Sequence, residues 1–219
     1  MRVIFLGPPG SGKGTQAKLL GQRQNLLHIS TGDILRDAIA RNTSAGRQAR
    51  CFVKNGQLVP DEVVNEIIAQ RFKKRDKPQR FVLDGYPRTL AQALSFDRVL
   101  EEGALPLDAV IVLAVPDADI VKRLSGRWNC PKPDCKATFH TLFKPPARPG
   151  ICDECGSALM QRDDDKEETV RHRLAIFHQN NQPILEHYRR QGLLVEVPGV
   201  GDIDTIYNNV VQAVHGAVK

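Results

Sequence analysis

Nine residues near the N-terminus have the composition of a loop that binds phosphate groups. Residues 7–15 read Gly-Pro-Pro-Gly-Ser-Gly-Lys-Gly-Thr and directly follow the apolar run Val3–Leu6. Glycines let backbone N–H groups surround phosphate oxygens, Lys13 can reach the outer phosphates, and a helix starting there adds its dipole. A plain glycine-rich turn with a surface lysine would not need so many fixed positions. The pattern predicts a nucleoside-triphosphate site and phosphoryl chemistry.

The residue after the lysine departs from the usual phosphate loop. A Ser or Thr whose hydroxyl binds Mg²⁺ normally stands there, but this chain has Gly14 and places Thr15 one position later. Signalling GTPases and most motor or transport ATPases keep that hydroxyl. The variant therefore indicates a subset of nucleotide enzymes.

Two close pairs of cysteines predict a structural metal site. Cys130 and Cys135 are followed, after sixteen residues, by Cys152 and Cys155. Four thiolates can close a tetrahedral zinc site, and a lobe of about 40 residues has too little core to fold without such help. The alternatives are two disulfides, which a reducing cytosol disfavours, or four unrelated free thiols, which would rarely share this spacing.

Two other residues near this chemistry are expected to be structural. His140 could replace one cysteine ligand, but a histidine beside Phe139 is more often simply packed. Cys51 lies outside the cysteine lobe, and we expect it to be a small buried or half-buried residue.

The elements that must position these residues alternate along the chain. Five apolar runs predict strands separated by helical patterns, which indicates a parallel sheet with helices on both faces. The predicted strands are Val3–Leu6, Leu26–Ile29, Phe81–Leu83, Ala109–Val115 and Leu193–Val197.

Two longer helical patterns are expected to serve packing. Residues 60–75 carry one apolar stripe after Asp61 and Glu62, which predicts a structural helix and not a site. Residues 167–190 also have a helical pattern, but Pro183 is expected to end one helix or begin the next.

Two stretches do not follow this alternation. Residues 30–59 predict a small excursion of short helices rich in arginine. Residues 126–165, rich in Cys, Pro and Gly, predict a small separate lobe.

Composition limits the class of protein. The chain has 219 residues, 41% of them hydrophobic and 26% charged, as expected for one soluble globular unit. The net charge of +6 and a pI of about 9.2 suit an anionic partner, and polyphosphates satisfy that as well as nucleic acid does. No run approaches the roughly 18 apolar residues of a membrane span, and the first apolar run is too short for a leader. We expect a cytoplasmic protein without a membrane partner.

Two further motifs give the chain its resemblance to a family. Ser30-Thr-Gly-Asp-Ile-Leu-Arg36 and Asp84-Gly-Tyr-Pro-Arg-Thr89 each follow a predicted strand. With the phosphate loop they make the chain, from Met1 to about Ile203, resemble the adenylate kinases in their zinc-containing, long-lid form. The resemblance implies an α/β fold of the P-loop nucleoside-monophosphate kinases, with a five-stranded parallel sheet flanked by helices, a helical AMP-binding lobe and a zinc-ribbon-like lid.

The same resemblance implies a division of the chain and a reaction. Residues 1–29, 60–125 and 166–219 would form the core, residues 30–59 the AMP-binding lobe, and residues 126–165 the zinc-binding lid. The family transfers the terminal phosphoryl group of Mg-ATP to AMP and yields two ADP. The lid must close before transfer to exclude water, and adenylate kinase lids are themselves a standard example of such closure. A monomer, Mg²⁺ with ATP, and structural Zn²⁺ are also implied.

On the donor side the resemblance implies a set of ATP-binding residues. Asp84 would act on Mg²⁺ through water, like a Walker B carboxylate, although a helix or turn cap is the alternative. The implied ATP-binding residues are Gly10, Ser11, Gly12, Lys13, Gly14, Thr15, Arg123 and Arg127.

On the acceptor side the resemblance implies arginines that clamp phosphate and residues that read the base. Ser30 or Thr31 could instead serve as a helix N-cap whatever the ligand, and any single arginine could be a surface ion pair of at most about 1 kcal/mol. Asp164 and Asp165 could belong to the site or start the long helix. The implied AMP-binding residues are Thr31, Arg36, Leu58, Val59, Gly85, Arg88, Gln92, Arg162 and Arg173, and the implied catalytic residues are Lys13, Asp84, Arg88, Arg123, Arg162 and Arg173.

Alternative functions are weaker. Thr89 and the long lid favour AMP as acceptor, because the related UMP/CMP kinases usually carry Asn there and a short lid. A zinc-ribbon nucleic-acid-binding ATPase would fit the basic pI, but aromatic residues, on which bases would stack, are only 5% of the chain. We therefore expect no nucleic-acid partner.

Overall fold

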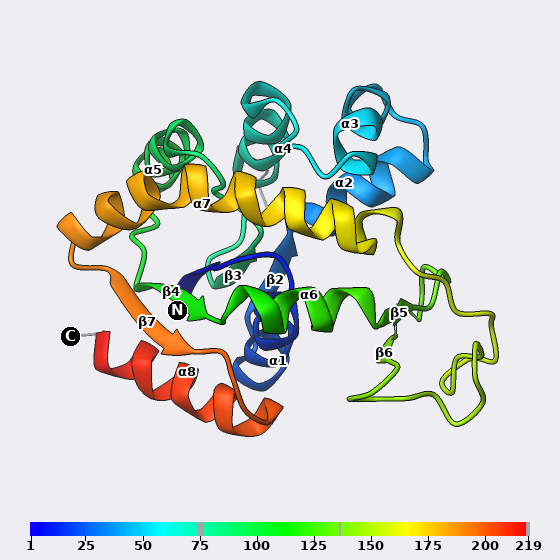
Figure 1. Ribbon diagram of the computed structural model, residues 1–219. Coiled ribbons are helices and arrows are strands. Elements are labelled where there is room, and N and C mark those ends of the chain that lie inside the picture. The colour runs from blue at the N-terminus through cyan, green and yellow to red at the C-terminus, as the bar shows by residue number, and fades with distance from the viewer. Residues whose placement is uncertain (74–76, 136, 218–219) are drawn as a thin grey trace.

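A five-stranded parallel sheet forms the centre of the protein, in the order β2-β3-β1-β4-β7 (Figure 1). The computed structural model describes residues 1–73, 77–135 and 137–217. All five predicted strands are confirmed. They are β1 (Arg2–Leu6), β2 (Leu27–Ser30), β3 (Phe81–Asp84), β4 (Ala109–Ala114) and β7 (Leu194–Pro198).

Helices cover both faces of this sheet (Figure 1). The helices are α1 (Lys13–Gln24), α2 (Thr31–Ala40), α3 (Ser44–Lys54), α4 (Asp61–Lys73), α5 (Leu90–Gly103), α6 (Asp117–Ser125), α7 (Glu167–Arg190) and α8 (Ile203–Ala217). Strand side chains alternate between the faces: Ile4 packs with α4, α5 and α7, whereas Val3 and Phe5 pack with α1 and α8. The predicted two-sided α/β arrangement is therefore confirmed.

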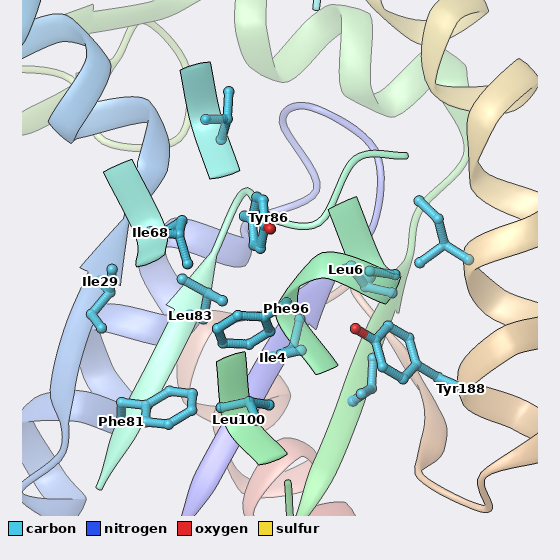
Figure 2. Packing of buried hydrophobic residues seen from close by; sticks show 14 of the residues in the cluster. Ile4, Leu6, Ile29, Ile68, Phe81, Leu83, Tyr86, Phe96, Leu100 and Tyr188 are labelled. Carbon is cyan, nitrogen blue, oxygen red and sulfur yellow. The ribbon is translucent and has the colours of Figure 1, made fainter. Parts of the chain in front are cut away.

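Aromatic rings fill the core beneath α4 and α5. Figure 2 shows the ring of Phe96 between those of Phe81 and Tyr86. Its centroid lies 6.3 Å from Phe81 and 5.5 Å from Tyr86, and both pairs have the edge-to-face geometry that aromatic rings prefer. Tyr86 is in the loop that follows β3, so this packing fixes the start of the segment that carries Gly85 and Arg88.

Two excursions leave the sheet. The first comprises α2 and α3, which pack so closely that a Cβ added at Gly46 would come within van der Waals overlap of the carbonyl of Ala38. The second lies to the right in Figure 1 and contains the antiparallel pair β5 (Arg127–Asn129) and β6 (Thr138–His140). It returns to the core through a short 3₁₀ helix, η1 (Asp163–Asp165).

Two sequence predictions are wrong. Pro183 does not interrupt α7, which runs unbroken from Glu167 to Arg190. Ile184 and Tyr188, just beyond the proline, are buried in the main core, and this packing outweighs the missing hydrogen bond. Cys51 is exposed, because the buried side of α3 is formed by Gly46 and Ala49.

Two further points concern the limits of the helices. The predicted end of the helix over residues 60–75 lies outside the described residues, since α4 is described only to Lys73. In the described part of the chain, no helix is both long and apolar enough to span a bilayer.

Candidate active site

The phosphate loop joins β1 to α1, and glycines are needed where it passes close to its neighbours. Gly7 has a φ of 135°, and a Cβ there would come 2.7 Å from the carbonyl oxygen of Leu113 in β4. A Cβ on Gly10, whose φ is 82°, would come 2.6 Å from Leu124 in α6. Only glycine adopts these conformations without strain, so the loop is held tightly against β4 and α6.

Lys13 is the first residue of α1 and lies among other charged groups. Its Nζ donates a hydrogen bond to the carbonyl oxygen of Pro8 at 2.7 Å. Burial lowers the pKa of Lys13 to about 8, and the carboxylate of Asp84 opposes this shift. The positive charges of Arg88, Arg173 and Arg127 lower the pKa further. These cations therefore face the same space as the lysine of the phosphate loop.

Asp84 ends β3 directly beside the position of the missing hydroxyl. A Cβ on Gly14 would lie 3.2 Å from Asp84 Oδ2. The two sites that Mg²⁺ enzymes of this type use, the residue after the lysine and the strand-end carboxylate, are thus adjacent here. A side chain at position 14 would therefore be in tight contact with the carboxylate of Asp84.

A pocket opens between α2, the segment from α3 to α4, and the loop after β3. It brings together eight of the nine sequence-predicted acceptor residues; Arg162 is the exception. The lining consists of Thr31, Gly32, Leu35, Arg36, Val53, Gly56, Gln57, Leu58, Val59, Val64, Gly85, Arg88, Gln92, Asp164 and Arg173. The sequence analysis did not predict several of these residues. Gly56 was the easiest of them to predict, because a glycine between two helices indicates a turn, and its φ of 69° fits such a turn.

Several arginines lie close together between this pocket and the phosphate loop. Burial lowers the pKa of Arg88 to about 10, and the neighbouring guanidinium of Arg173 adds to the shift. Burial likewise lowers the pKa of Arg162 to about 10, and Arg36 and Arg127 contribute. Like charges held this close are unfavourable without anions, so the arrangement is one that phosphate groups would stabilise.

Two carboxylates at the end of the second excursion hold part of this positive charge. Arg173 Nη1 donates to Asp164 Oδ2 at 2.8 Å. Arg127 donates to the buried Asp165 from both Nε and Nη2. Asp164 lines the pocket, whereas Asp165 is fully buried, and η1, which contains both, directly precedes α7.

Arg123 lies on a different side of the phosphate loop from the acceptor pocket. It donates to the carbonyl oxygen of Gly199 at 3.0 Å, and a Cβ on Gly199 would lie 3.3 Å from the carbonyl oxygen of Ser11. The same segment exposes Val200 and Ile203, each 53% accessible. The sequence analysis did not predict that this segment lies beside the phosphate loop. Its signal in the sequence is apolar residues in a glycine-rich turn.

Helix capping separates the roles of Ser30 and Thr31. Ser30 is the N-cap of α2 and accepts from the backbone N–H of Asp33 at 3.3 Å. Thr31 instead donates to the carbonyl oxygen of Asp84 at 3.3 Å and lines the pocket. The predicted N-cap at Ser30 or Thr31 is therefore confirmed at Ser30, whereas Thr31 is the first residue of the helix.

The four cysteines of the second excursion lie together. All their Sγ atoms are within 4.8 Å of one another, and the Cys130–Cys155 and Cys135–Cys152 pairs are 3.4 and 3.7 Å apart. Tetrahedral Zn–S bonds of about 2.3 Å place sulfur atoms about 3.8 Å apart, so the cluster fits zinc. His140 is not a member, because its Nδ1 accepts the backbone N–H groups of Leu142 and Phe143.

The fold and the site together define a P-loop protein with a second pocket that is lined by arginines. A family model described as "Adenylate kinase" matches residues 5–193. The chain is 46% identical over 210 residues to an adenylate kinase of Archaeoglobus fulgidus, covering 96% of both chains. It is 47% identical over 213 residues to one of Caldicellulosiruptor bescii, covering 97% of this chain and 98% of the relative. The chain belongs to the adenylate kinase family.

Proposed function

We propose that this protein catalyses the reversible transfer of the terminal phosphoryl group of Mg-ATP to AMP, which yields two ADP. Membership of the adenylate kinase family supports the reaction. One observation carries the residue assignment: the phosphate-loop lysine Lys13 shares its electrostatic surroundings with Arg88 and Arg173, which line a separate pocket. A donor and an acceptor phosphate placed there would face each other.

The donor nucleotide is assigned to the phosphate loop. Residues 10–15 would surround the β- and γ-phosphates with backbone N–H groups, and Lys13 would contact the outer phosphates. Mg²⁺ enters with ATP as part of the substrate, and Asp84 would hold its water ligands beside Gly14. The base would rest against the exposed apolar side chains of Val200 and Ile203, beside Arg123.

AMP is assigned to the pocket between α2, α3 and the loop after β3. Its phosphate would lie between Arg36 and Arg88, whose guanidinium groups can bind it through paired hydrogen bonds. Its base would lie at the end formed by Thr31 and Gln92, against Leu58 and Val59. Residues 30–59 would thus act as the AMP-binding lobe.

Stabilisation of the transferring group is assigned to the arginines around the phosphate loop and the acceptor pocket. Negative charge spreads over the phosphoryl oxygens during transfer, so cations in a water-poor site lower the barrier. Arg123, Arg127, Arg162 and Arg173 are the available groups. Asp164 and Asp165 would hold Arg173 and Arg127 until phosphates replace the carboxylates.

The excursion of residues 126–165 is assigned as the lid. Its closure over both nucleotides would exclude water and so favour transfer over hydrolysis. Zinc bound by the four cysteines would serve this lobe as a structural element, since four thiolates leave no open ligand position.

A coupled assay with Mg-ATP and each of AMP, UMP, CMP and GMP tests the function. We expect ADP formation with AMP at a kcat/KM at least about a hundredfold above that with the pyrimidine nucleotides. Arg88→Lys should raise the KM for AMP, whereas Arg98→Lys, an exposed residue of the neighbouring helix, should not. Preference for UMP or CMP would identify a different nucleoside-monophosphate kinase and overturn the assignment of the pocket.

We further propose that the enzyme is a cytoplasmic monomer that binds neither nucleic acid nor membranes. Light scattering of the purified protein would test the mass of the particle, and a salt-dependent gel shift would argue for a nucleic-acid partner.

A further inference from the structure

Asp61, the first residue of α4, connects two side chains at the base end of the acceptor pocket. Its Oδ1 accepts a hydrogen bond from Gln92 Nε2 at 2.7 Å, and its Oδ2 accepts one from Thr89 Oγ1 at 2.7 Å. Gln92 lines the pocket and is only 2% exposed. Among the described residues the lining includes Gln92 but not Asp61. A carboxylate behind the pocket thus holds a side chain that faces into it.

The hydrogen-bond partners of Gln92 allow one orientation of its amide. A carboxylate can only accept, so the group that faces Asp61 must be the NH₂. The backbone N–H of Arg88 can only donate, and it lies 2.7 Å from Gln92 Oε1, so the other group must be the carbonyl. A flipped amide would leave donor against donor and acceptor against acceptor, which is costly in a buried position.

Thr89 completes the arrangement. Because its hydroxyl donates to Asp61, its lone pairs are free to accept the backbone N–H of Gln92, at 3.1 Å, as the N-cap of α5. The side chain and the backbone of Gln92 are therefore both fixed through the same carboxylate, 31 residues away in the sequence.

This fixed amide has a consequence for the base that it contacts. Adenine presents the N6 amino donor beside a ring-nitrogen acceptor, whereas a 6-oxopurine presents the acceptor O6 at the corresponding position. One N–H and one oxygen lone pair of Gln92 remain after its internal bonds are made. We propose that Asp61 is a positioning residue that sets the acceptor specificity, because its hold on Gln92 favours 6-aminopurine over 6-oxopurine nucleotides. The inference rests on the proposed placement of AMP in this pocket.

Steady-state kinetics of Asp61→Ala with AMP and with IMP test the inference. We expect the KM for AMP to rise about tenfold with kcat changed less than about threefold, and the preference for AMP over IMP to fall about tenfold. Asp61→Asn keeps an acceptor oxygen for Gln92 and should restore most of the preference. Glu62→Gln removes the same charge from the same helix turn at an exposed position, and it should behave like the wild type. An unchanged AMP to IMP preference in folded Asp61→Ala would overturn the proposal.

A double-mutant cycle with Gln92→Ala separates this role from a general loss of structure. If Asp61 acts through Gln92, adding Asp61→Ala to Gln92→Ala should change the KM for AMP less than about twofold. A full tenfold further rise would show that Asp61 acts independently and would refute the inference. If Gln92→Ala alone left the KM for AMP unchanged, the base end of the proposed site would be wrong, and the inference would fall with it. Thermal melts of each variant establish that the assays are made on folded protein.

Discussion

Arg127 is held by the carboxylate of Asp165 through two hydrogen bonds, 2.9 Å from Nε to Oδ2 and 2.5 Å from Nη2 to Oδ1. Asp165 is fully buried, and its Oδ1 also lies 3.9 Å from Arg173 Nη1. One carboxylate therefore compensates charge on the first strand of the proposed lid and on the long core helix, since Arg127 begins β5 and Arg173 lies in α7.

We expect Asp165→Asn to lower the free energy of unfolding by about 3 kcal/mol, because it leaves two guanidinium groups with less compensation. Urea denaturation measures this change. Glu168→Gln, an exposed carboxylate three residues on, is the matched control and should stay within about 0.5 kcal/mol of the wild type. Equal stability of Asp165→Asn and the wild type would mean that the pair contributes nothing in solution.

The cysteine cluster predicts a bound metal that stabilises the fold of the small lobe without taking part in phosphoryl transfer. Chelation should lower the Tm by about 10 °C, because metal binding contributes directly to folding of the small lobe. Turnover of the protein that remains folded at 25 °C should fall less than about threefold. Calorimetry and the coupled assay, before and after chelation, check both statements.

Single cysteine variants sharpen that experiment. Cys135→Ser should lower both the zinc content and the Tm, whereas Cys51→Ser, an exposed cysteine outside the cluster, should change neither. Zinc loss without a change in Tm would contradict the structural role.

The lowered pKa of Lys13 predicts that ATP binding depends on pH. Its pKa of about 8 in the free protein means that the ammonium group loses its proton as the pH rises above that value. The dissociation constant for ATP should therefore increase above pH 8, by up to about tenfold per pH unit. In Lys13→Met, binding should be weaker at pH 7 and should not change between pH 8 and 9.5. Isothermal titration calorimetry at a series of pH values is the measurement, and a flat wild-type profile would be inconsistent with the lowered pKa.

The lowered pKa of Lys13 has the opposite effect on the stability of the ATP-free protein, which should increase as the pH rises. The folded-state pKa lies below the ordinary value of 10.5, so burial of the charged lysine disfavours the folded state below about pH 8. This penalty disappears as the pH rises toward 10.5. Lys13→Met should therefore have a higher Tm than the wild type at pH 7 without nucleotide, although it is the less active protein.

The close approach of Gly14 to Asp84 predicts that any side chain at position 14 lowers activity. In Gly14→Ala the new Cβ would lie 3.2 Å from Asp84 Oδ2, so the carboxylate must move and the space for a hydrated cation shrinks. We expect kcat to fall about tenfold and the Mg²⁺ requirement to rise. Gly216→Ala, on α8 with no neighbour within 4 Å, should leave both unchanged. Full activity of Gly14→Ala would argue against a role for this space.

The sequence predicted the sheet well because its three central strands, β1, β3 and β4, are buried on both sides. Runs such as Val3–Leu6 and Ala109–Val115 have no other stable location in a soluble α/β protein. Pro183 misled the prediction, because local propensity penalises a proline in a helix while the packing of Ile184 and Tyr188 is a tertiary effect.

The candidate site was predictable only where a motif carried it. Predicted residues such as Thr31 and Arg88 do line one pocket, although their roles stay predictions. Asp61 was expected to serve packing, since its favourable place at a helix N-terminus already explained it. Its contacts with Thr89 and Gln92, 28 and 31 residues away, depend on how α4 and α5 pack and leave no local pattern.

The continuity of α7 through Pro183 fixes a distance across the molecule. Arg173 and Tyr188 belong to one unbroken helix, which holds them about 22 Å apart along its axis. Tyr188 is buried in the main core beside the sheet, as Figure 2 shows, whereas Arg173 lines the pocket between α2 and the loop after β3. The helix therefore acts as a rigid spacer of fixed length, so the position of the Arg173 guanidinium at the pocket depends on how well the ring of Tyr188 packs at the opposite end.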